Sequence, residues 1–137
     1  MRVALDTNTV LFGLLSPRRR LAWLRDTWTG ARVLPLVCSA TVCELIRALA
    51  YPKFEIRDRG VQVCLAAYLP FTESVDLADV AAIEVPLCRE PDDQVFLQIA
   101  AVGGAEVIVT GYADILEPAD RAAFTIEAPT SFKRRLG

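Results

Sequence analysis

The chain begins Met-Arg-Val-Ala-Leu-Asp-Thr-Asn (residues 1–8), which places a carboxylate directly after a short apolar run. A continuous apolar run is typical of a strand that is buried on both faces of a parallel sheet. Ligands of open α/β sheets bind at the carboxyl ends of the strands. A carboxylate is costly to bury there unless an opposite charge offsets it. The stretch therefore predicts a first strand over residues 2–5 and a functional acid at Asp6.

The rest of the chain alternates between strand-like and helix-like segments. Short apolar runs predict strands over residues 33–37, 71–75, 107–110 and 124–127. Apolar spacing and breaker residues predict helices over residues 17–28, from 41 until Pro52 closes the helix, 61–69, 93–102 and 129–136. This alternation indicates an α/β fold in which helices cover both faces of a parallel sheet.

The composition is that of a folded chain of modest size. Its 137 residues favour one domain over residues 1–137. Hydrophobic residues make up 53% of the chain and the mean hydropathy is +0.34, which argues against disorder. No apolar stretch is long enough to span a bilayer, and the N-terminus lacks the h-region and cleavage site of a signal peptide. We therefore expect a cytoplasmic protein whose four cysteines are reduced.

The chain contains no histidine, and this absence restricts its chemistry. It excludes a Ser-His-Asp triad, a Cys-His dyad and histidine-based ribonuclease chemistry. It also removes the usual zinc ligands. If the chain is an enzyme, carboxylates and a hard, oxygen-binding cation are the expected agents. The net charge of −2 means that any contact with nucleic acid needs a local basic patch.

Further acids stand near the starts of two predicted helices. Glu44 is the last residue of Thr41-Val-Cys-Glu, so it fits both a helix-capping box and a ligand that reaches toward Asp6. Asp92 and Asp93 open the next candidate helix, where the macrodipole favours acids. Spacing alone does not separate the two interpretations of Glu44, and it favours capping for at least one of the paired aspartates.

Asp114 comes shortly after the strand predicted over residues 107–110, as Asp6 comes after the first strand. Taken alone it is a loop or capping acid. Polar residues stand at the same two strand ends, namely Thr7, Asn8 and Thr110. They are either partners that orient the carboxylates or ordinary turn formers. Together the acids predict a negatively charged pocket that holds a divalent metal ion.

Four segments together resemble the PIN domain family, in particular the VapC-like toxins of type II toxin–antitoxin systems. These segments are Leu5-Asp6-Thr7-Asn8 with residues 11–16; Ser39 through Glu44-Leu45 to Tyr51-Pro52-Lys53-Phe54; Arg89-Glu90-Pro91-Asp92-Asp93 with Phe96-Leu97 and Ala100; and Val109-Thr110-Gly111 with Asp114-Ile115-Leu116. The order and spacing of the four carry the resemblance, which extends to Phe132 near the end of the chain.

The resemblance implies a three-layer α/β/α sandwich with a central, mainly parallel sheet, formed as a single PIN-like domain. It implies a ribonuclease that depends on Mg²⁺ or Mn²⁺, with Asp6, Glu44, Asp93 and Asp114 as the catalytic and metal-binding residues and Asp92 beside them. In such an enzyme the metal activates a water for in-line attack on RNA. Cleavage by this route is expected to leave a 5′-phosphate and a 3′-hydroxyl.

Tyr112 departs from the family pattern. The family usually has Thr-Gly-Asp-x-Asp where this chain has Thr-Gly-Tyr-Ala-Asp. A phenol is a poor ligand for Mg²⁺ at neutral pH because its pKa is near 10. The site could thus be weaker, could bind one ion instead of two, or could depend on Asp114 alone. The alternative function is a degenerate PIN domain that binds RNA or a protein partner without cleavage. A carboxylate–metal phosphatase is a third hypothesis, weakened because the sequence has no phosphate-binding glycine loop.

RNA binding requires cations, and Arg18, Arg19 and Arg20 lie nearest in sequence to the first predicted strand. For any one of them, solvated surface is the simpler interpretation. The resemblance also implies a small antitoxin protein as partner. Leu24 and Trp28 lie on an apolar helix face, for which we expect core packing. The alternatives for that face are a groove for an antitoxin helix and a homodimer contact.

Overall fold

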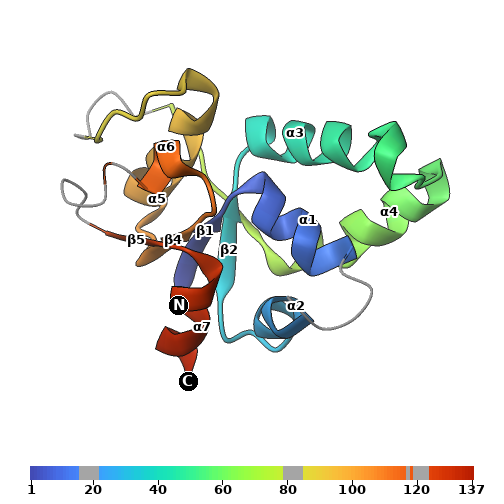
Figure 1. Cartoon of the computed structure of the whole chain (residues 1–137), viewed down its shortest axis with the longest axis horizontal. Helices are drawn as coiled ribbons and strands as arrows, with labels where there is room; N and C mark the ends of the chain where they lie inside the picture. The colour runs from blue at the N-terminus through green and yellow to red at the C-terminus, as the bar shows by residue number, and fades with distance from the viewer. Residues whose placement is uncertain (16–21, 79–84, 117, 119–123) are drawn as a thin grey trace.

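A computed structural model describes residues 1–15, 22–78, 85–116, 118 and 124–137 (Figure 1). The side chains of residues 113 and 114 lie outside this description. The candidate RNA contacts Arg18, Arg19 and Arg20 also lie outside it, as does the side chain of Asp114. Their proposed roles therefore remain predictions.

A five-stranded sheet forms the centre of the fold, and every strand pair in it is parallel. The strands are β1 (Arg2–Leu5), β2 (Leu34–Val37), β3 (Glu73–Ser74), β4 (Val107–Val109) and β5 (Thr125–Glu127). Each of them lies within a segment that the sequence predicts as a strand. The prediction of a parallel α/β sheet is confirmed.

The strand order β3-β2-β1-β4-β5 puts β1 at the middle of the sheet. Val3 pairs with Pro35 of β2 on one side and with Val107 of β4 on the other. The chain winds outward from β1 through β2 and β3, then crosses to the other side for β4 and β5. The winding direction therefore reverses between β1 and β4. In open α/β sheets, ligands bind outside the carboxyl ends of the strands at such a reversal.

Helices cover both faces of the sheet. They are α1 (Thr7–Leu15), α2 (Ala22–Thr29), α3 (Ser39–Leu49), α4 (Asp58–Ala66), α5 (Gln94–Gly103), α6 (Ala113–Leu116) and α7 (Pro129–Leu136). Short 3₁₀ helices span Pro52–Phe54 (η1), Leu69–Phe71 (η2) and Pro91–Asp93 (η4). None of the described helices is long and apolar enough to cross a bilayer.

Alternate residues of the central strands enter two separate apolar clusters, as the two-residue period of a strand requires. Val3 and Val109 pack in one cluster with side chains of α1, α2, α3, α4 and α7. Ala4 and Ile108 pack in the other cluster with side chains of α5 and α6. This is the expected three-layer α/β/α sandwich.

Several sequence predictions about the core hold in the structure. Leu24 and Trp28 are buried, as core packing requires. Trp28 also donates a hydrogen bond from Nε1 to the Ala67 carbonyl (3.0 Å) and makes an edge contact with Tyr68, with 4.9 Å between the ring centroids. All four cysteines lie in the described part of the chain, and none of them forms a disulfide.

The sequence analysis did not predict helix α1 at Thr7–Leu15. The helix begins here because Asp6 caps it. The Thr9 N–H donates to Asp6 Oδ1 (2.7 Å), and the Val10 N–H donates to the Asp6 carbonyl (3.1 Å). The helix is mostly apolar, so it lacks the polar face that would mark a surface helix in the sequence.

Helix α1 packs closely on α2 through Gly13. A Cβ at this position would lie 2.8 Å from the Trp28 ring. We expect Gly13→Ala to lower the free energy of unfolding by about 1–3 kcal/mol, because the anchored Trp28 ring cannot move without loss of its contacts. This cost outweighs the gain in helix propensity, which is about 1 kcal/mol. Urea unfolding measures the difference.

Gly111→Ala is the control. A Cβ at this exposed position would meet no atom within 4 Å, so the substitution only restricts the unfolded chain. We expect this variant to be neutral or slightly stabilising. Equal losses in both variants would contradict the proposed rigidity of the α1–α2 contact.

Candidate acidic site

Asp6 lies where β1 ends and α1 begins, and its side chain is 0% exposed. Oδ1 accepts a hydrogen bond from the Thr9 N–H (2.7 Å). Oδ2 accepts one from the Thr110 hydroxyl and one from the Gly111 N–H (3.3 Å). These donors are all neutral. They fix the orientation of the carboxylate, but they do not offset its charge as a cation would.

Thr110 stands at the carboxyl end of β4, beside β1, and is fully buried. Its hydroxyl donates to Asp6 and accepts from the Tyr112 N–H (3.0 Å). Its own N–H donates to the Glu127 carbonyl at the end of β5 (3.0 Å). The structure thus brings Thr110 to Asp6 although 104 positions separate them in the sequence.

Glu44 lies inside α3 and does not cap it. The helix begins at the N-cap Cys38, whose N–H donates to the Thr41 hydroxyl (3.0 Å). Thr41 is therefore the third residue of the helix, and of the two interpretations of Glu44 the capping box is wrong. Helix capping therefore does not account for the half-buried Glu44 side chain.

Asp92 and Asp93 have different surroundings although they are adjacent. Asp92 is exposed in η4, and its N–H donates to Glu90 Oε1 (3.5 Å). Asp93 is half-buried at the N-cap position of α5, yet its side chain makes no capping hydrogen bond to that helix. Glu90 therefore caps the 3₁₀ turn, and helix capping does not explain the Asp93 carboxylate.

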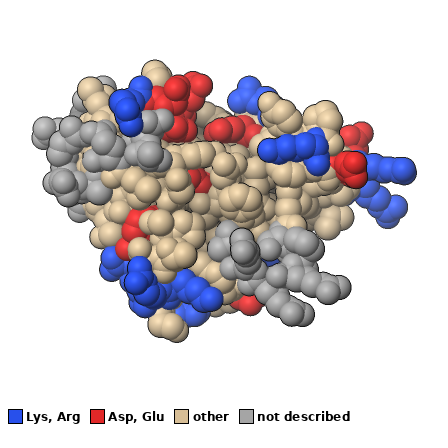
Figure 2. All heavy atoms as spheres, in the orientation of Figure 1, with Lys and Arg blue, Asp and Glu red and all other residues tan. Residues whose placement is uncertain are grey.

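The pKa of Tyr112 depends on how these acids are arranged. Its phenol is partly buried, and burial together with the negative charges of Asp6, Asp93 and Glu44 raises the pKa of Tyr112 to about 12. Three acids, one after β1, one in η4 and one in α3, thus contribute to the raised pKa of one hydroxyl. Figure 2 shows acidic side chains on the face where α3 lies beside the half of the molecule that carries α5 and α6. The sequence analysis did not foresee this role of Tyr112 as the point that the acids share.

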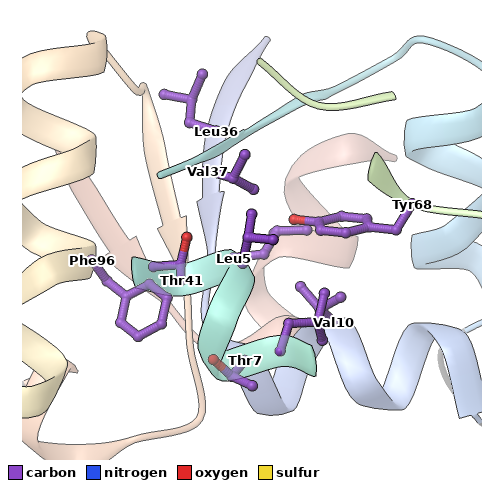
Figure 3. Close-up of a pocket in the computed structure, with 10 residues that line it drawn as sticks. Leu5, Thr7, Val10, Leu36, Val37, Thr41, Tyr68 and Phe96 are labelled. Atoms are coloured by element: carbon purple, nitrogen blue, oxygen red, sulfur yellow. The ribbon is translucent and has the colours of Figure 1, made fainter. Parts of the chain in front are cut away.

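The remaining predicted residues lie at the edge of this site. Asn8 is exposed in the first turn of α1. Thr7 is buried and lines a pocket with Leu5, Thr41 and Phe96 (Figure 3). The backbone of Asp114 lies in α6, which follows Tyr112 directly.

The pocket in Figure 3 is not the acidic site. Most of its lining side chains are apolar, no acid lines it, and its space is on the order of a single water molecule. The Tyr68 ring reaches into it, and burial raises the pKa of this phenol above its usual value. The pocket is therefore a small gap in the core beside the strand end, too narrow for a nucleotide.

The donor set at the acidic site fits a hard divalent cation. Asp6, Glu44 and Asp93 offer only oxygen atoms, which suit Mg²⁺ or Mn²⁺. Within the described residues, no three acidic or cysteine side chains are close enough to form a complete metal site. Mg²⁺ often keeps several waters and binds one or two carboxylates directly. A loose set of acids around one buried carboxylate therefore fits an ion held partly through water.

These features define a class: a parallel α/β/α domain with an acidic site where the winding of its sheet reverses. The family model described as "PIN domain" matches residues 2–113, and the chain belongs to the PIN domain family. No curated protein matches its sequence.

A similar fold is found in the crystal structure of VapBC2 from Rickettsia felis bound to a DNA fragment from their promoter. The TM-score is 0.64, and the match covers 93% of this chain and 98% of that one. The two sequences are 16% identical, so the likeness concerns the fold.

The shared influence of the acids on Tyr112 can be tested. We expect Glu44→Gln and Asp93→Asn each to lower the pKa of Tyr112, because each removes a negative charge that opposes phenolate formation. The measurement is a spectrophotometric tyrosinate titration, with Tyr112→Phe subtracted to isolate the signal. Glu106→Gln, at the amino end of β4, is the control and should leave the pKa unchanged. An unchanged pKa in Glu44→Gln would remove Glu44 from the site.

The same titration has a consequence for stability. The pKa of Tyr112 is higher in the folded chain than in the unfolded chain, so the folded state holds its proton more tightly. Stability linked to this group is present below about pH 10 and is lost as the pH rises toward about 12. The decline with pH should be shallower in Tyr112→Phe.

Proposed function

We propose that the chain is a metal-dependent endoribonuclease that hydrolyses RNA phosphodiester bonds, and that it is the toxin of a toxin–antitoxin pair. PIN domains are generally nucleases that use divalent metal ions. The observation that carries the proposal is the buried Asp6 carboxylate, which neutral donors hold in one orientation where the winding of the sheet reverses. Glu44 and Asp93 lie near enough to contribute to the raised pKa of Tyr112, and the chain has no histidine to provide another route.

Each residue has a distinct role in this proposal. Asp6, Glu44, Asp93 and Asp114 hold Mg²⁺ or Mn²⁺, directly or through water. A divalent ion here supplies activation of the attacking water and stabilisation of charge on the leaving oxygen. Thr110 and the Gly111 N–H keep Asp6 in one orientation, which is the usual task of the groups behind a metal ligand. Burial of Asp6 keeps bulk water from competing for its oxygens.

RNA also requires cations near the acidic site. Arg47 is an exposed candidate that the sequence analysis missed, and it lies one helical turn after Glu44 on α3. Arg18, Arg19 and Arg20 remain candidates from the sequence.

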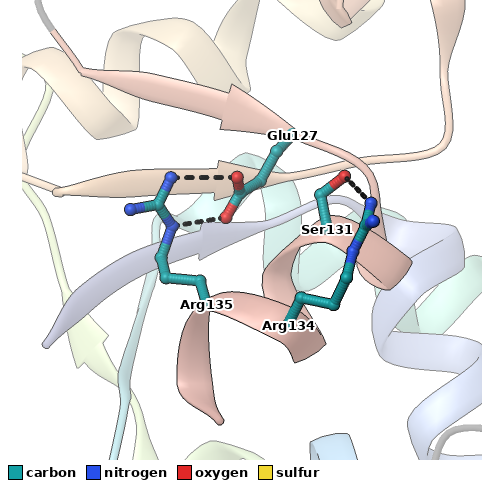
Figure 4. Close-up of polar contacts among 4 residues, drawn as sticks. All are labelled: Glu127, Ser131, Arg134 and Arg135. Carbon is teal, nitrogen blue, oxygen red and sulfur yellow. Dashed lines mark hydrogen bonds and ion pairs between the residues drawn. The ribbon is translucent and has the colours of Figure 1, made fainter.

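The cations of α7 fit this role less well. The last turn of α7 lies near the amino ends of the strands, because the Arg32 guanidinium before β2 donates to the Leu136 carbonyl (2.8 Å). Arg135 is held by Glu127 through two hydrogen bonds (2.7 and 3.0 Å), and Arg134 donates to Ser131 (3.4 Å; Figure 4). Both side chains are therefore engaged in contacts within the fold.

The proposal that the chain is a toxin is supported by structural similarity. The structurally similar chain comes from a VapBC2 complex bound to promoter DNA. We propose a small antitoxin protein as partner of this chain, with a homodimer as a further state. Exposed apolar side chains on three neighbouring helices offer a contact surface, namely Phe12 of α1, Ile46 of α3 and Val63 of α4.

The second candidate function is a PIN domain that binds RNA or a protein without cleavage. One observation favours it, namely the neutral phenol of Tyr112 among the carboxylates. The two functions differ in their products. Cleavage releases 5′-phosphate ends only in the presence of metal, whereas a binding module shifts RNA in a gel without shortening it.

Metal dependence gives the main test. We expect saturating Mn²⁺ to raise the free energy of unfolding by about 2.7 kcal/mol when its concentration is 100 times the dissociation constant. We expect Asp6→Asn to lose this stabilisation and to cleave single-stranded RNA at least about 100-fold more slowly, because loss of even a group behind a metal ligand typically costs about 10–100-fold. The asparagine oxygen can still accept from the Thr9 N–H, but its amide nitrogen cannot accept from the Gly111 N–H, so the effect of metal is measured relative to the metal-free stability of each variant.

Glu106→Gln is the matched control, since this exposed acid lies at the other end of the sheet. It should behave like the wild type in both measurements. Equal cleavage by wild type and Asp6→Asn would mean that the activity comes from a contaminant or that the site lies elsewhere. Metal-dependent stabilisation without cleavage would favour the binding module.

Arg47 can be tested through the salt dependence of RNA binding. We expect Arg47→Ala to weaken binding of single-stranded RNA and to reduce the magnitude of the slope of log K against log salt by about 0.7. Arg134→Ala, on α7, is the control and should change neither quantity. Fluorescence anisotropy with the cleavage-deficient Asp6→Asn background provides the measurement. A larger effect of Arg134 would move the RNA path to the α7 side.

A further inference from the structure

Gln94 is the first residue of α5, and its side-chain amide holds the segment that leads into η4. Its Oε1 accepts a hydrogen bond from the Cys88 N–H (2.9 Å), and its Nε2 donates to the Pro86 carbonyl (2.8 Å). These two backbone groups lie on either side of Leu87, so the amide pairs with the backbone much as a neighbouring strand would. Both contacts are partly buried. The amide therefore fastens residues 86–88 to the start of the helix.

A side-chain amide suits this pair of contacts because it carries a hydrogen-bond acceptor and a donor side by side. An ionised carboxylate only accepts, and a lysine or arginine only donates. The Cys88 N–H requires the acceptor and the Pro86 carbonyl requires the donor, so the two partners agree on one orientation of the amide. Replacement of Gln94 by an apolar side chain of similar length would leave both backbone groups without this partner.

The fastened segment returns to Asp93 through further hydrogen bonds. The Cys88 thiol donates to the Glu90 carbonyl (3.1 Å), which also accepts from the Asp93 N–H (3.1 Å). On the other side of Asp93, the Gln94 N–H donates to the Pro91 carbonyl. The chain from Cys88 to Gln94 is thus closed into a loop by the Gln94 side chain, and Asp93 lies within it.

The place of the Asp93 carboxylate depends on this loop. Asp93 is half-buried at the N-cap position of α5, yet its side chain makes no capping hydrogen bond that would fix it to the helix. A group that orients a metal ligand typically contributes about 10–100-fold to metal affinity. The backbone turn that carries Asp93 is such a group if Asp93 binds the ion.

We propose that Gln94 is a positioning residue of the metal site, whose amide holds residues 86–88 against α5 and thereby fixes the place of the Asp93 carboxylate. The inference rests on the proposed function and adds to it a residue that touches neither the ion nor the RNA. Loss of the amide weakens metal binding through Asp93 and leaves the hydrogen bonds of Asp6 intact.

Gln94→Met tests this role, because it removes both amide contacts and keeps a side chain of similar length. We expect its dissociation constant for Mn²⁺ to rise about 10-fold, measured by isothermal titration calorimetry on the folded protein. Gln98→Met is the matched control, since Gln98 is also half-buried and lies one turn further along α5. It should keep the wild-type constant. A merely structural role of Gln94 would lower the free energy of unfolding and leave the Mn²⁺ constant unchanged.

A double-mutant cycle shows whether Gln94 acts through Asp93. In a Glu44→Gln background, Gln94→Met should still weaken Mn²⁺ binding about 10-fold. In an Asp93→Asn background it should have little further effect, because the carboxylate that it positions is absent.

Hydrogen exchange in the wild type gives a readout that needs no variant. Coupling is reciprocal, so an ion that binds more tightly when the segment is held also holds the segment more tightly. We expect saturating Mg²⁺ to slow the exchange of the Cys88 N–H about 10-fold, measured by NMR. The Gly30 N–H, which donates to the Asp26 carbonyl at the end of α2, is the control and should exchange at the same rate with and without Mg²⁺.

The outcomes separate the inference from the proposed function. An unchanged Mn²⁺ constant in a folded Gln94→Met, or equal losses in the Asp93→Asn and Glu44→Gln backgrounds, would overturn the inference and leave the metal-dependent nuclease standing. If Gln94→Met does not fold, an unchanged exchange rate of the Cys88 N–H in saturating Mg²⁺ would overturn the inference in the same way. Failure of the wild type to bind Mn²⁺ would overturn the proposed metal site and the inference with it.

Discussion

The hydrogen bonds of one buried carboxylate join three parts of this fold. Asp6 terminates the central strand β1, caps helix α1 through the Thr9 N–H, and binds the turn after β4 through Thr110 and Gly111. Hydrogen bonds to an ionised acceptor are roughly twice as strong as those between neutral groups. The relative positions of β1, α1 and the β4–α6 turn therefore depend on this side chain, and so does the place of Tyr112 at the site.

The two central strands could be predicted from the sequence because they are buried on both faces. Residues 3–5 and 107–109 are continuous apolar runs, and no helical face competes with them. Helix α1 was missed for two reasons. Its apolar residues surround it on all sides, and Asp6 was interpreted only as a functional acid although an Asp before a helix is also a capping signal.

Only the residues of the site that lie at strand ends could be placed from the sequence. Asp6 and Thr110 meet because the carboxyl ends of neighbouring parallel strands lie at one edge of a sheet. The position of Glu44 depends on where α3 begins, and the sequence offered a capping box that the Cys38–Thr41 hydrogen bond replaces. The influence of three acids on Tyr112 depends on how α3 and η4 approach each other, which no local pattern encodes.

All the hydrogen-bond donors to Asp6 are neutral groups, and this bears on the proposed binding of a cation. A lysine or arginine in place of Thr110 would offset the buried charge without a metal ion, and the site would then have little need of one. Hydroxyl and backbone N–H donors satisfy the oxygen atoms but leave the net charge in place. Every buried side-chain nitrogen and oxygen in the described residues has a hydrogen-bond partner. Under the proposed function, a divalent cation bound by Asp6 would supply the missing positive charge, and its binding would stabilise the same turn that holds Tyr112.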